Sequence, residues 1–505
     1  MDAPKTDKLS LFPLTALVVG SMIGSGIFNL PQNMAESSGV LAIIVAWVIT
    51  FAGMFCLAKV FQQLALRRPD INTGPYGYAR EGFGDYIGFN TAWGMWISAM
   101  AGNAGYLVMF FAGLGGFAMF DFFGDGTNTA SLIASLTVLW LIHALVLRGV
   151  TTAAFVNTII TLAKVLPVLF FIAVVIAFFQ APIFKEGLFG PGNLKDILTP
   201  MSGSLSSMSN SWFSDMLSSP EARAVMLDQV KSCMLYTVWV FIGIESASIY
   251  ASRAKDMKTV GRATTTGFII TIAMYMAVSL FSLGIVPQDQ LANMANPSMR
   301  GVMTLALGSG AANIISIGVI ISVGGAFLAW TMLAAEIIFN TSRGKHGTGP
   351  QIFRKVNAAG APNAALWFTN IVVSIMLFTA WKFNAGYNEI ILLATAMTLI
   401  PYLLSSLFAL LKTTKKAEGS GLDWRFFCVA LVSSLYGVWL IYAAGVQYLL
   451  LSMILYAPGV LFFFYGRKED KLPYLENWRE VALVILVTVL AAVAIYELLS
   501  GNLSL

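Results

Sequence analysis

Gly20-Ser21-Met22-Ile23-Gly24-Ser25-Gly26-Ile27-Phe28 lies in the middle of the first apolar segment of this chain. Its three glycines and two serines are poor helix formers, because each Gly inside a helix costs about 1 kcal/mol relative to Ala. In hydrocarbon, every freed backbone N–H or C=O costs several kcal/mol unless it meets protein, water or a ligand. The stretch therefore predicts a broken membrane helix at a ligand site, as in secondary transporters. A packing face built on Gly20 and Gly24 explains the same glycines without a ligand.

Composition places the chain among polytopic membrane proteins. Of its 505 residues, 57% are hydrophobic and 11% are charged, whereas soluble proteins carry about 25% charged residues. Apolar runs of about 20 residues, long enough to span a bilayer, predict an all-α fold with about thirteen spans. The first run is too long for a signal peptide, so we expect it to be retained. The expected spans are 11–31, 40–66, 86–119, 131–148, 158–181, 232–251, 264–285, 311–340, 364–381, 389–411, 427–445, 448–466 and 480–499.

The residue types that bind metals and cofactors are scarce. Three widely spaced cysteines and two histidines predict no disulfide framework, no zinc site and no haem. A phosphate-binding GxxxxGK[ST] motif is absent from the sequence, which argues against coupling to ATP. We therefore expect no cofactor. The formal charge of +5 is interpreted as membrane orientation rather than as affinity for nucleic acid, because the basic residues flank the spans.

The basic residues also predict the topology. They gather in every second loop, which by the positive-inside rule places the N-terminus in the cytoplasm. An odd number of spans then places the C-terminus outside. Residues 182–231 are expected to form a long extracytoplasmic loop. The basic loop residues are Lys5, Lys8, Arg67, Arg68, Arg80, Arg148, Arg253, Lys255, Lys258, Arg262, Arg343, Lys345, Arg354, Lys355, Lys412, Lys415, Lys416, Arg425, Arg467, Lys468, Lys471 and Arg479.

A second break is predicted in the sixth span, at Trp239-Val240-Phe241-Ile242-Gly243-Ile244-Glu245-Ser246-Ala247-Ser248. An ionisable residue within a span indicates a functional site by default, so Glu245 is a candidate proton acceptor or counter-charge for a cation. A structural salt bridge, for instance with Lys164, is the alternative. Breaks in spans one and six are equivalent if residues 1–181 and 232–411 are two inverted repeats of five spans. Residues 412–505 would then add the C-terminal helices.

Four further residues carry polar or aromatic groups inside spans. Lys164 either reaches the membrane interface or faces the bundle, where it could replace a sodium ion. Asn103 needs hydrogen-bond partners, supplied by a neighbouring helix or by a ligand. Trp330 is a packing residue or an aromatic face for a cationic tail. Tyr402 follows Pro401, a predicted kink, and its hydroxyl could latch a gate.

Together, residues 20–28 with Pro31, residues 74–80 and residues 239–248 resemble the amino acid–polyamine–organocation superfamily. More narrowly, the chain is similar to the basic amino acid/polyamine antiporters. Residues 248–255, 260–264, 330–336 and 361–370 resemble arginine/ornithine antiporters in particular. The resemblance implies a five-plus-five inverted-repeat fold, extra C-terminal helices and alternating access to a site at the membrane midplane.

The resemblance also implies roles for single residues at the two breaks. Ser25 and Gly26 match the unwound first helix, whose N–H groups hold the substrate carboxylate, with Met22 and Gly24 beside it. In the sixth span, the matching acceptors for the α-amino group are the carbonyls of Ile242 and Gly243.

The substrate side chain and the gates are assigned in the same way. Trp239 and Trp330 match the aromatic gate and the aromatic face beneath a guanidinium, and Asn103 matches a polar contact to the side chain. Glu245 matches a carboxylate of proton sensing or gating, and Lys164 a lysine of sodium-independent members. Val240 stands where arginine/agmatine exchangers have a serine, which argues against agmatine as the counter-substrate.

The resemblance therefore implies a secondary antiporter in the bacterial inner membrane that exchanges arginine for ornithine without moving net charge. Exchangers of an amino acid for its amine, such as histidine/histamine or lysine/cadaverine, are the alternative, followed by a proton-coupled symporter. A channel filter and an intramembrane protease constellation are not found in the sequence. The expected partners are amino acids, amines and the lipid bilayer, and the composition is compatible with a monomer or a homodimer.

Overall fold

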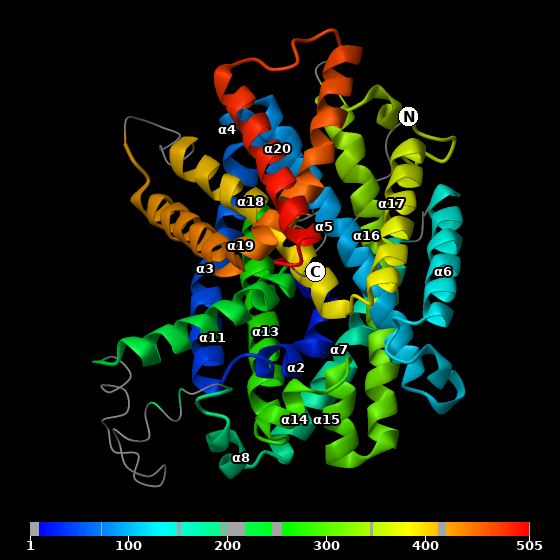
Figure 1. Cartoon of the computed structure of the whole chain (residues 1–505), viewed down its shortest axis with the longest axis vertical. Coiled ribbons are helices and arrows are strands. Elements are labelled where there is room, and N and C mark those ends of the chain that lie inside the picture. The colour runs from blue at the N-terminus through cyan, green and yellow to red at the C-terminus, as the bar shows by residue number, and fades with distance from the viewer. Residues whose placement is uncertain are drawn as a thin grey trace.

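The computed structural model describes residues 10–71, 73–148, 153–191, 194, 197, 218–244, 255–343, 347–412 and 421–503, and this part of the chain is helical without a β-strand. Its first half forms the helices that are shown in blue to green in Figure 1. These are α1 (Leu11–Met22), η1 (Gly26–Asn29), α2 (Leu30–Ala35), α3 (Val40–Arg67), α4 (Pro75–Phe83), α5 (Asp85–Gly115), η2 (Ala118–Phe123), α6 (Thr129–Leu147), α7 (Ala153–Ala177), α8 (Ala181–Glu186) and α11 (Pro220–Trp239).

The second half continues the helical bundle and contains its longest helices. These are α13 (Met257–Ser282), α14 (Gln288–Ala292), α15 (Ser298–Leu307), α16 (Ser309–Ser342), η5 (Gln351–Arg354), α17 (Asn363–Phe383), α18 (Tyr387–Lys412), α19 (Trp424–Glu469) and α20 (Trp478–Leu499).

Nine of the described helices are long and apolar enough to cross a membrane. The segments Leu14–Met22 and Gly26–Ala35, bent by 48° at the break between them, make a tenth span when taken together. The chain is therefore a multi-pass membrane protein, as its composition predicts. The more detailed expectation of about thirteen spans stays a prediction.

The expected spans 427–445 and 448–466 appear as a single 46-residue helix, α19. That helix is interrupted at Gly445, whose φ of 75° is a conformation that side chains with a Cβ rarely adopt. The two expected spans thus lie on either side of this glycine. In contrast, α18 continues as one helix through Pro401.

Helix α5 forms the centre of the bundle. Of its most apolar 18-residue window, 89% is buried, against 11% of the equivalent window of α20. The less buried helix is the more apolar one, because the mean hydropathy is 2.6 for α20 and 1.4 for α5. A more apolar helix with less burial is typical of a lipid-facing surface, so α20 lies at the periphery and α5, packed between α16 and α18, supports the interior.

The two ends of the bundle are distinct (Figure 1). Helix α4 and the loop between α19 and α20 lie at the upper end, and α8, α14 and α15 lie at the lower end. An ion pair between Arg67 and Asp423 joins the end of α3 to the start of α19.

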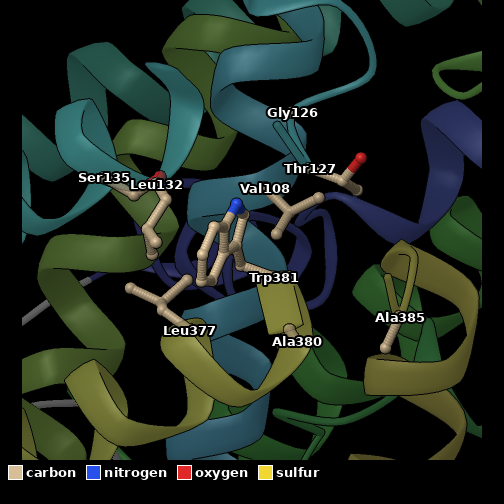
Figure 2. Close-up of a pocket in the computed structure, with 9 residues that line it drawn as sticks. All are labelled: Val108, Gly126, Thr127, Leu132, Ser135, Leu377, Ala380, Trp381 and Ala385. Carbon is tan, nitrogen blue, oxygen red and sulfur yellow. The ribbon is translucent and has the colours of Figure 1, made fainter. Parts of the chain in front are cut away.

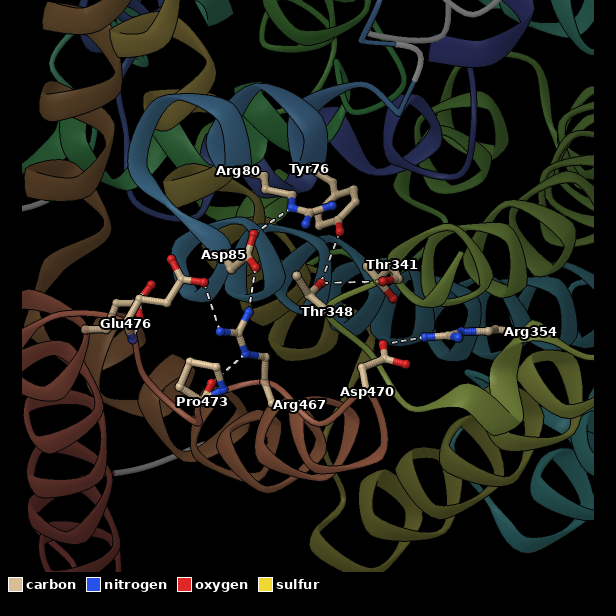
Figure 3. A network of polar contacts seen from close by, with 11 residues as sticks. Tyr76, Arg80, Asp85, Thr341, Thr348, Arg354, Arg467, Asp470, Pro473 and Glu476 are labelled. Atoms are coloured by element: carbon tan, nitrogen blue, oxygen red, sulfur yellow. Dashed lines mark hydrogen bonds and ion pairs between the residues drawn. The ribbon is translucent and has the colours of Figure 1, made fainter. Parts of the chain in front are cut away.

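A buried ion network fastens the upper end (Figure 3). Arg467, only 1% exposed, donates to Asp85 at 2.7 Å, to Glu476 at 2.9 Å and to the Pro473 carbonyl at 2.8 Å. Asp85 also accepts a hydrogen bond from Arg80 at 2.7 Å. Since a buried guanidinium is strongly unfavourable without partners, these contacts fix the α19–α20 connection against α4 and the start of α5.

Candidate functional site

The first predicted break is present in the structure. Helix α1 ends at Met22, Ile23 has an extended conformation with ψ of 98°, and the chain turns into η1 at Gly26. The first N–H groups of a helix have no partner within it. Those at the start of η1 are thus available to a ligand, and the fully buried Ser25 lies beside them.

Lys164 satisfies the carbonyl groups that the break sets free. Its side chain is only 3% exposed, and its Nζ donates to the Gly20 carbonyl and, at 2.7 Å, to the Ile23 carbonyl. Ser322 on α16 donates to the next carbonyl, that of Gly24, at 3.1 Å. The ammonium therefore faces the bundle interior rather than the membrane interface, and it lies where the negative end of the α1 dipole favours a cation.

The second break lies against the first. Helix α11 ends at Trp239, and Gly243 in the following turn has a φ of +108°. A Cβ at Gly243 would lie 2.8 Å from the Ser21 carbonyl oxygen, and Ser21 Oγ donates to the Gly243 carbonyl at 3.4 Å. Glycine is thus required at this position by both conformation and space. Glu245 lies outside the described residues, so its role stays a prediction.

Tyr275 on α13 links the two breaks through a single hydroxyl. Its OH lies 2.8 Å from the Met22 carbonyl oxygen and 2.7 Å from the Val240 carbonyl oxygen. A phenol has only one proton to donate, so the two carbonyls compete for it. The side chain of Ile242, two residues after Val240, is also buried.

A cluster of aromatic side chains covers the first break. A Cβ at Gly26 would lie 2.7 Å from Trp239 Cδ1, and one at Gly24 would lie 3.1 Å from the Tyr106 hydroxyl. The rings of Tyr106 and Trp239 are 6.1 Å apart. Tyr387 completes the cluster, with its hydroxyl 2.6 Å from Ser25 Oγ and 3.1 Å from Trp239 Nε1.

Sequence reasoning missed the three tyrosines. Tyr106 lies one helical turn after Asn103, so its position on the same face of the third span was a usable signal. Tyr387 precedes the expected tenth span at 389–411, and no pattern in the sequence places it beside residue 25. Tyr275 carries no signal beyond being a polar aromatic in an apolar span.

Asn103 and Trp330 lie on facing helices. Asn103 on α5 is fully buried, and its Nδ2 donates to Thr331 Oγ1 at 3.4 Å. Its Oδ1 has no hydrogen-bond partner, which leaves a buried acceptor for a ligand donor. Trp330, the neighbour of Thr331 on α16, is half-buried. The Asn103 amide thus forms a hydrogen bond to a neighbouring helix through Nδ2 and keeps Oδ1 as an acceptor for a ligand.

Tyr402 lies away from this cluster. It is buried on α18, with its ring 5.9 Å from that of Phe61 in an edge-on arrangement. Fifteen residues separate it from Tyr387 on the same helix, which corresponds to about 22 Å along the axis. Its predicted role as a gate latch stays a prediction.

Figure 2 shows a separate pocket with mostly apolar walls, contributed by α5, the segment before α6, α6 itself, α17 and the turn before α18. It contains none of the predicted site residues. Among the described residues, no group of three or more His, Cys, Asp or Glu side chains could hold a metal ion.

The geometry at the breaks suits a zwitterion with a cationic tail. Backbone N–H groups, the Ser25 hydroxyl and the positive end of a helix favour a carboxylate. The Asn103 Oδ1 acceptor and tryptophan faces favour ammonium and guanidinium groups.

Comparison with known proteins identifies the family of this chain. The family profile described as amino acid permease matches residues 9–496. The chain is 42% identical over 516 residues to the arginine/ornithine antiporter of Pseudomonas aeruginosa, covering 100% of both chains. It is 39% identical over 497 residues to a putative arginine/ornithine antiporter of Escherichia coli K12, covering 97% of this chain and 99% of the relative.

An arginine/agmatine antiporter of Chlamydia felis is 36% identical over 497 residues, which are 97% of each chain. Because the family profile and these relatives extend over nearly the whole length of the sequence, this chain belongs to the amino acid permease family of the amino acid–polyamine–organocation superfamily.

Proposed function

We propose that this chain is a secondary active antiporter that exchanges arginine for ornithine by alternating access. The observation that carries the proposal is the meeting of the two broken helices, where Gly26 lies against the Trp239 ring and Lys164 donates to the Gly20 and Ile23 carbonyls. The names of the relatives that are 39–42% identical support the substrate pair.

The carboxylate of the substrate binds at the first break in this proposal. The Ser25 hydroxyl and the N–H groups of Ser25 and Gly26 donate to it, with Met22 and Gly24 at its border. Only glycine at position 26 leaves room for the Trp239 ring, because a Cβ there would lie 2.7 Å from Cδ1. The α-amino group binds the carbonyls of Ile242 and Gly243.

The side-chain end extends towards α5 and α16. Asn103 Oδ1, buried and without a partner, accepts a hydrogen bond from the guanidinium or ammonium. The Trp330 face adds a cation–π contact of about 0.5–2 kcal/mol. Both arginine and ornithine carry a cationic tail, so one site serves both directions of exchange.

Lys164 takes the place of a sodium ion in this scheme. Its ammonium neutralises the carbonyl end of α1, so transport needs no sodium gradient. Glu245 is proposed to sense protons or to gate, and Tyr402 to act in a gate.

The proposed architecture consists of two inverted repeats, residues 1–181 and 232–411, separated by the extracytoplasmic loop 182–231 and followed by helices in 412–505. The protein resides in the bacterial inner membrane with a cytoplasmic N-terminus and an outer C-terminus. Arg67, Arg80 and Arg467, at the ends of α3, α4 and α19, lie at the same end of the bundle, which supports this orientation.

Arginine/agmatine exchange is the second candidate, because relatives at 36% identity carry that name. Val240 argues against it. A Cβ at Gly26 would lie 2.7 Å from Val240 Cγ1, so Val240 lies beside the first break, and the resemblance places a serine at this position in arginine/agmatine exchangers.

Counterflow with different internal loads tests the proposal. Proteoliposomes are preloaded with ornithine, agmatine, histamine, cadaverine or buffer, and uptake of labelled arginine is measured without a sodium gradient. We expect ornithine to support the fastest uptake and buffer to support almost none. Equal uptake into empty vesicles would identify a uniporter or symporter, and uptake driven only by agmatine would favour the second candidate.

A further inference from the structure

Tyr387 links its own helix to residues at the two breaks, and neither the sequence patterns nor the names of the relatives assign it a role. It is the first residue of α18, it is only 4% exposed, and its hydroxyl contacts Ser25 at the first break and Trp239 at the second. On the proposed function, Ser25 binds the substrate carboxylate and Trp239 is a gate. A phenol that touches both lies between recognition and gating.

The direction of this hydrogen-bond chain follows from the chemistry of its members. An indole N–H can only donate, so the Tyr387 oxygen accepts from Trp239 Nε1. A substrate carboxylate can only accept, so the Ser25 hydroxyl donates to it when it is bound. Tyr387 then donates its own proton to Ser25 Oγ, and all bonds point from Trp239 through Tyr387 and Ser25 to the carboxylate.

Such an aligned chain strengthens each of its members, because every donor is polarised by the bond that it accepts. We propose that Tyr387 is a specificity-determining positioning residue, which orients the Ser25 hydroxyl as a donor and thereby favours substrates with a carboxylate over their decarboxylated amines. The inference rests on the proposed function and adds to it the group that selects amino acids.

The surroundings of Tyr387 keep this geometry fixed. A Cβ at Gly105 on α5 would lie 3.7 Å from Tyr387 Cδ2, so the ring packs against the central helix of the bundle. Its neighbour Asn388 accepts hydrogen bonds from Asn33 at 2.8 Å and from Asn296 at 3.1 Å. These bonds tie the start of α18 to α2 and to the segment before α15, and the phenol is held in place.

The test uses the full-length protein in proteoliposomes and the variants Tyr387→Phe, Ser25→Ala and the double variant. Exchange of labelled arginine for internal ornithine is first measured for the unchanged protein, and its absence would refute the proposed function without reference to Tyr387. Where exchange is present, Tyr387→Phe should raise the KM for arginine about tenfold or more, as loss of a bond in a chain to a charged group does.

Two further readouts separate positioning from structural support. The double variant should be no weaker than Ser25→Ala alone, since Tyr387 acts through Ser25. Agmatine has no carboxylate, so the agmatine concentration that halves arginine exchange should change less than about twofold in Tyr387→Phe. The inference would be overturned if the increases in KM of the two single variants multiplied in the double variant. It would also be overturned if Tyr387→Phe weakened the binding of arginine and of agmatine equally.

Tyr456→Phe is the matched control. Tyr456 is a buried tyrosine on α19 whose hydroxyl donates to the Met397 carbonyl on α18 at 3.2 Å, and it touches none of the site residues named above. Its KM for arginine should stay at the original value. An unchanged KM in Tyr387→Phe as well would also refute the role of Tyr387.

Discussion

Replacement of Lys164 by Met tests whether the ammonium holds the first break. Met is close to Lys in length but has no donor, so the carbonyl oxygens of Gly20 and Ile23 lose their partner. Each unsatisfied buried carbonyl costs about 1–3 kcal/mol, which gives about 2–6 kcal/mol for the pair. Burying an ammonium is itself unfavourable, and the Met variant no longer carries that cost. The expected loss of folding free energy is therefore near the lower value.

The loss of stability converts into a shift of the melting temperature. With about 2.1 cal/mol/K of unfolding entropy per residue, a chain of 505 residues has about 1 kcal/mol/K. We therefore expect Lys164→Met to lower the apparent Tm in detergent by about 2–6 °C. Arginine exchange should fall at least about tenfold, because a 1.4 kcal/mol distortion of the site is sufficient for that.

The control is Lys412→Met, since Lys412 lies exposed at the last turn of α18. Both Tm and exchange should be unchanged in this variant. If Lys164→Met also retained its Tm and its exchange rate, the ammonium would not support the break. Its role as a substitute for sodium would then be refuted too.

Two further substitutions probe the opposite ends of the site. If a cation–π contact holds the guanidinium, Trp330→Ala should weaken arginine binding by about 1–2 kcal/mol, or about 5–30-fold. An unchanged affinity in an equilibrium binding measurement would show that Trp330 is a packing residue. Gly243→Ala should abolish exchange, because the φ of +108° is unfavourable for alanine and its Cβ would lie 2.8 Å from the Ser21 carbonyl oxygen. Full exchange in this variant would show that the two breaks can separate. Gly360→Ala is the control for backbone strain alone, since Gly360 has a φ of +78° but open space around it.

The sequence was informative where local chemistry decides the structure. Glycine and serine in an apolar run predicted the break after Met22, since freed backbone groups in hydrocarbon need a partner. Gly243 marked the second break for the same reason. The interior position of Lys164 was one of two stated alternatives, and only packing distinguishes them: its partners, the carbonyls of Gly20 and Ile23, are more than 140 residues away in the chain.

Long-range contacts limited the prediction of the site. Tyr387 meets Ser25 across 362 residues, and no periodicity of either segment contains that information. Tyr402 has a clearer local signal, next to Pro401 in a span, yet it lies about four turns from Tyr387. Span counting was limited in a similar way, because Gly445 interrupts α19 without a polar loop.

The most direct test of the account is the effect of membrane potential on arginine uptake into ornithine-loaded proteoliposomes. Arginine and ornithine each carry about one positive charge near neutral pH, so one-for-one exchange moves no net charge, whereas exchange for a divalent amine moves one, worth about 2.3 kcal/mol per 100 mV. We predict the same rate and the same final accumulation at zero and at inside-negative potential. Accumulation that changes with potential, or that persists without internal ornithine, would contradict electroneutral arginine/ornithine exchange.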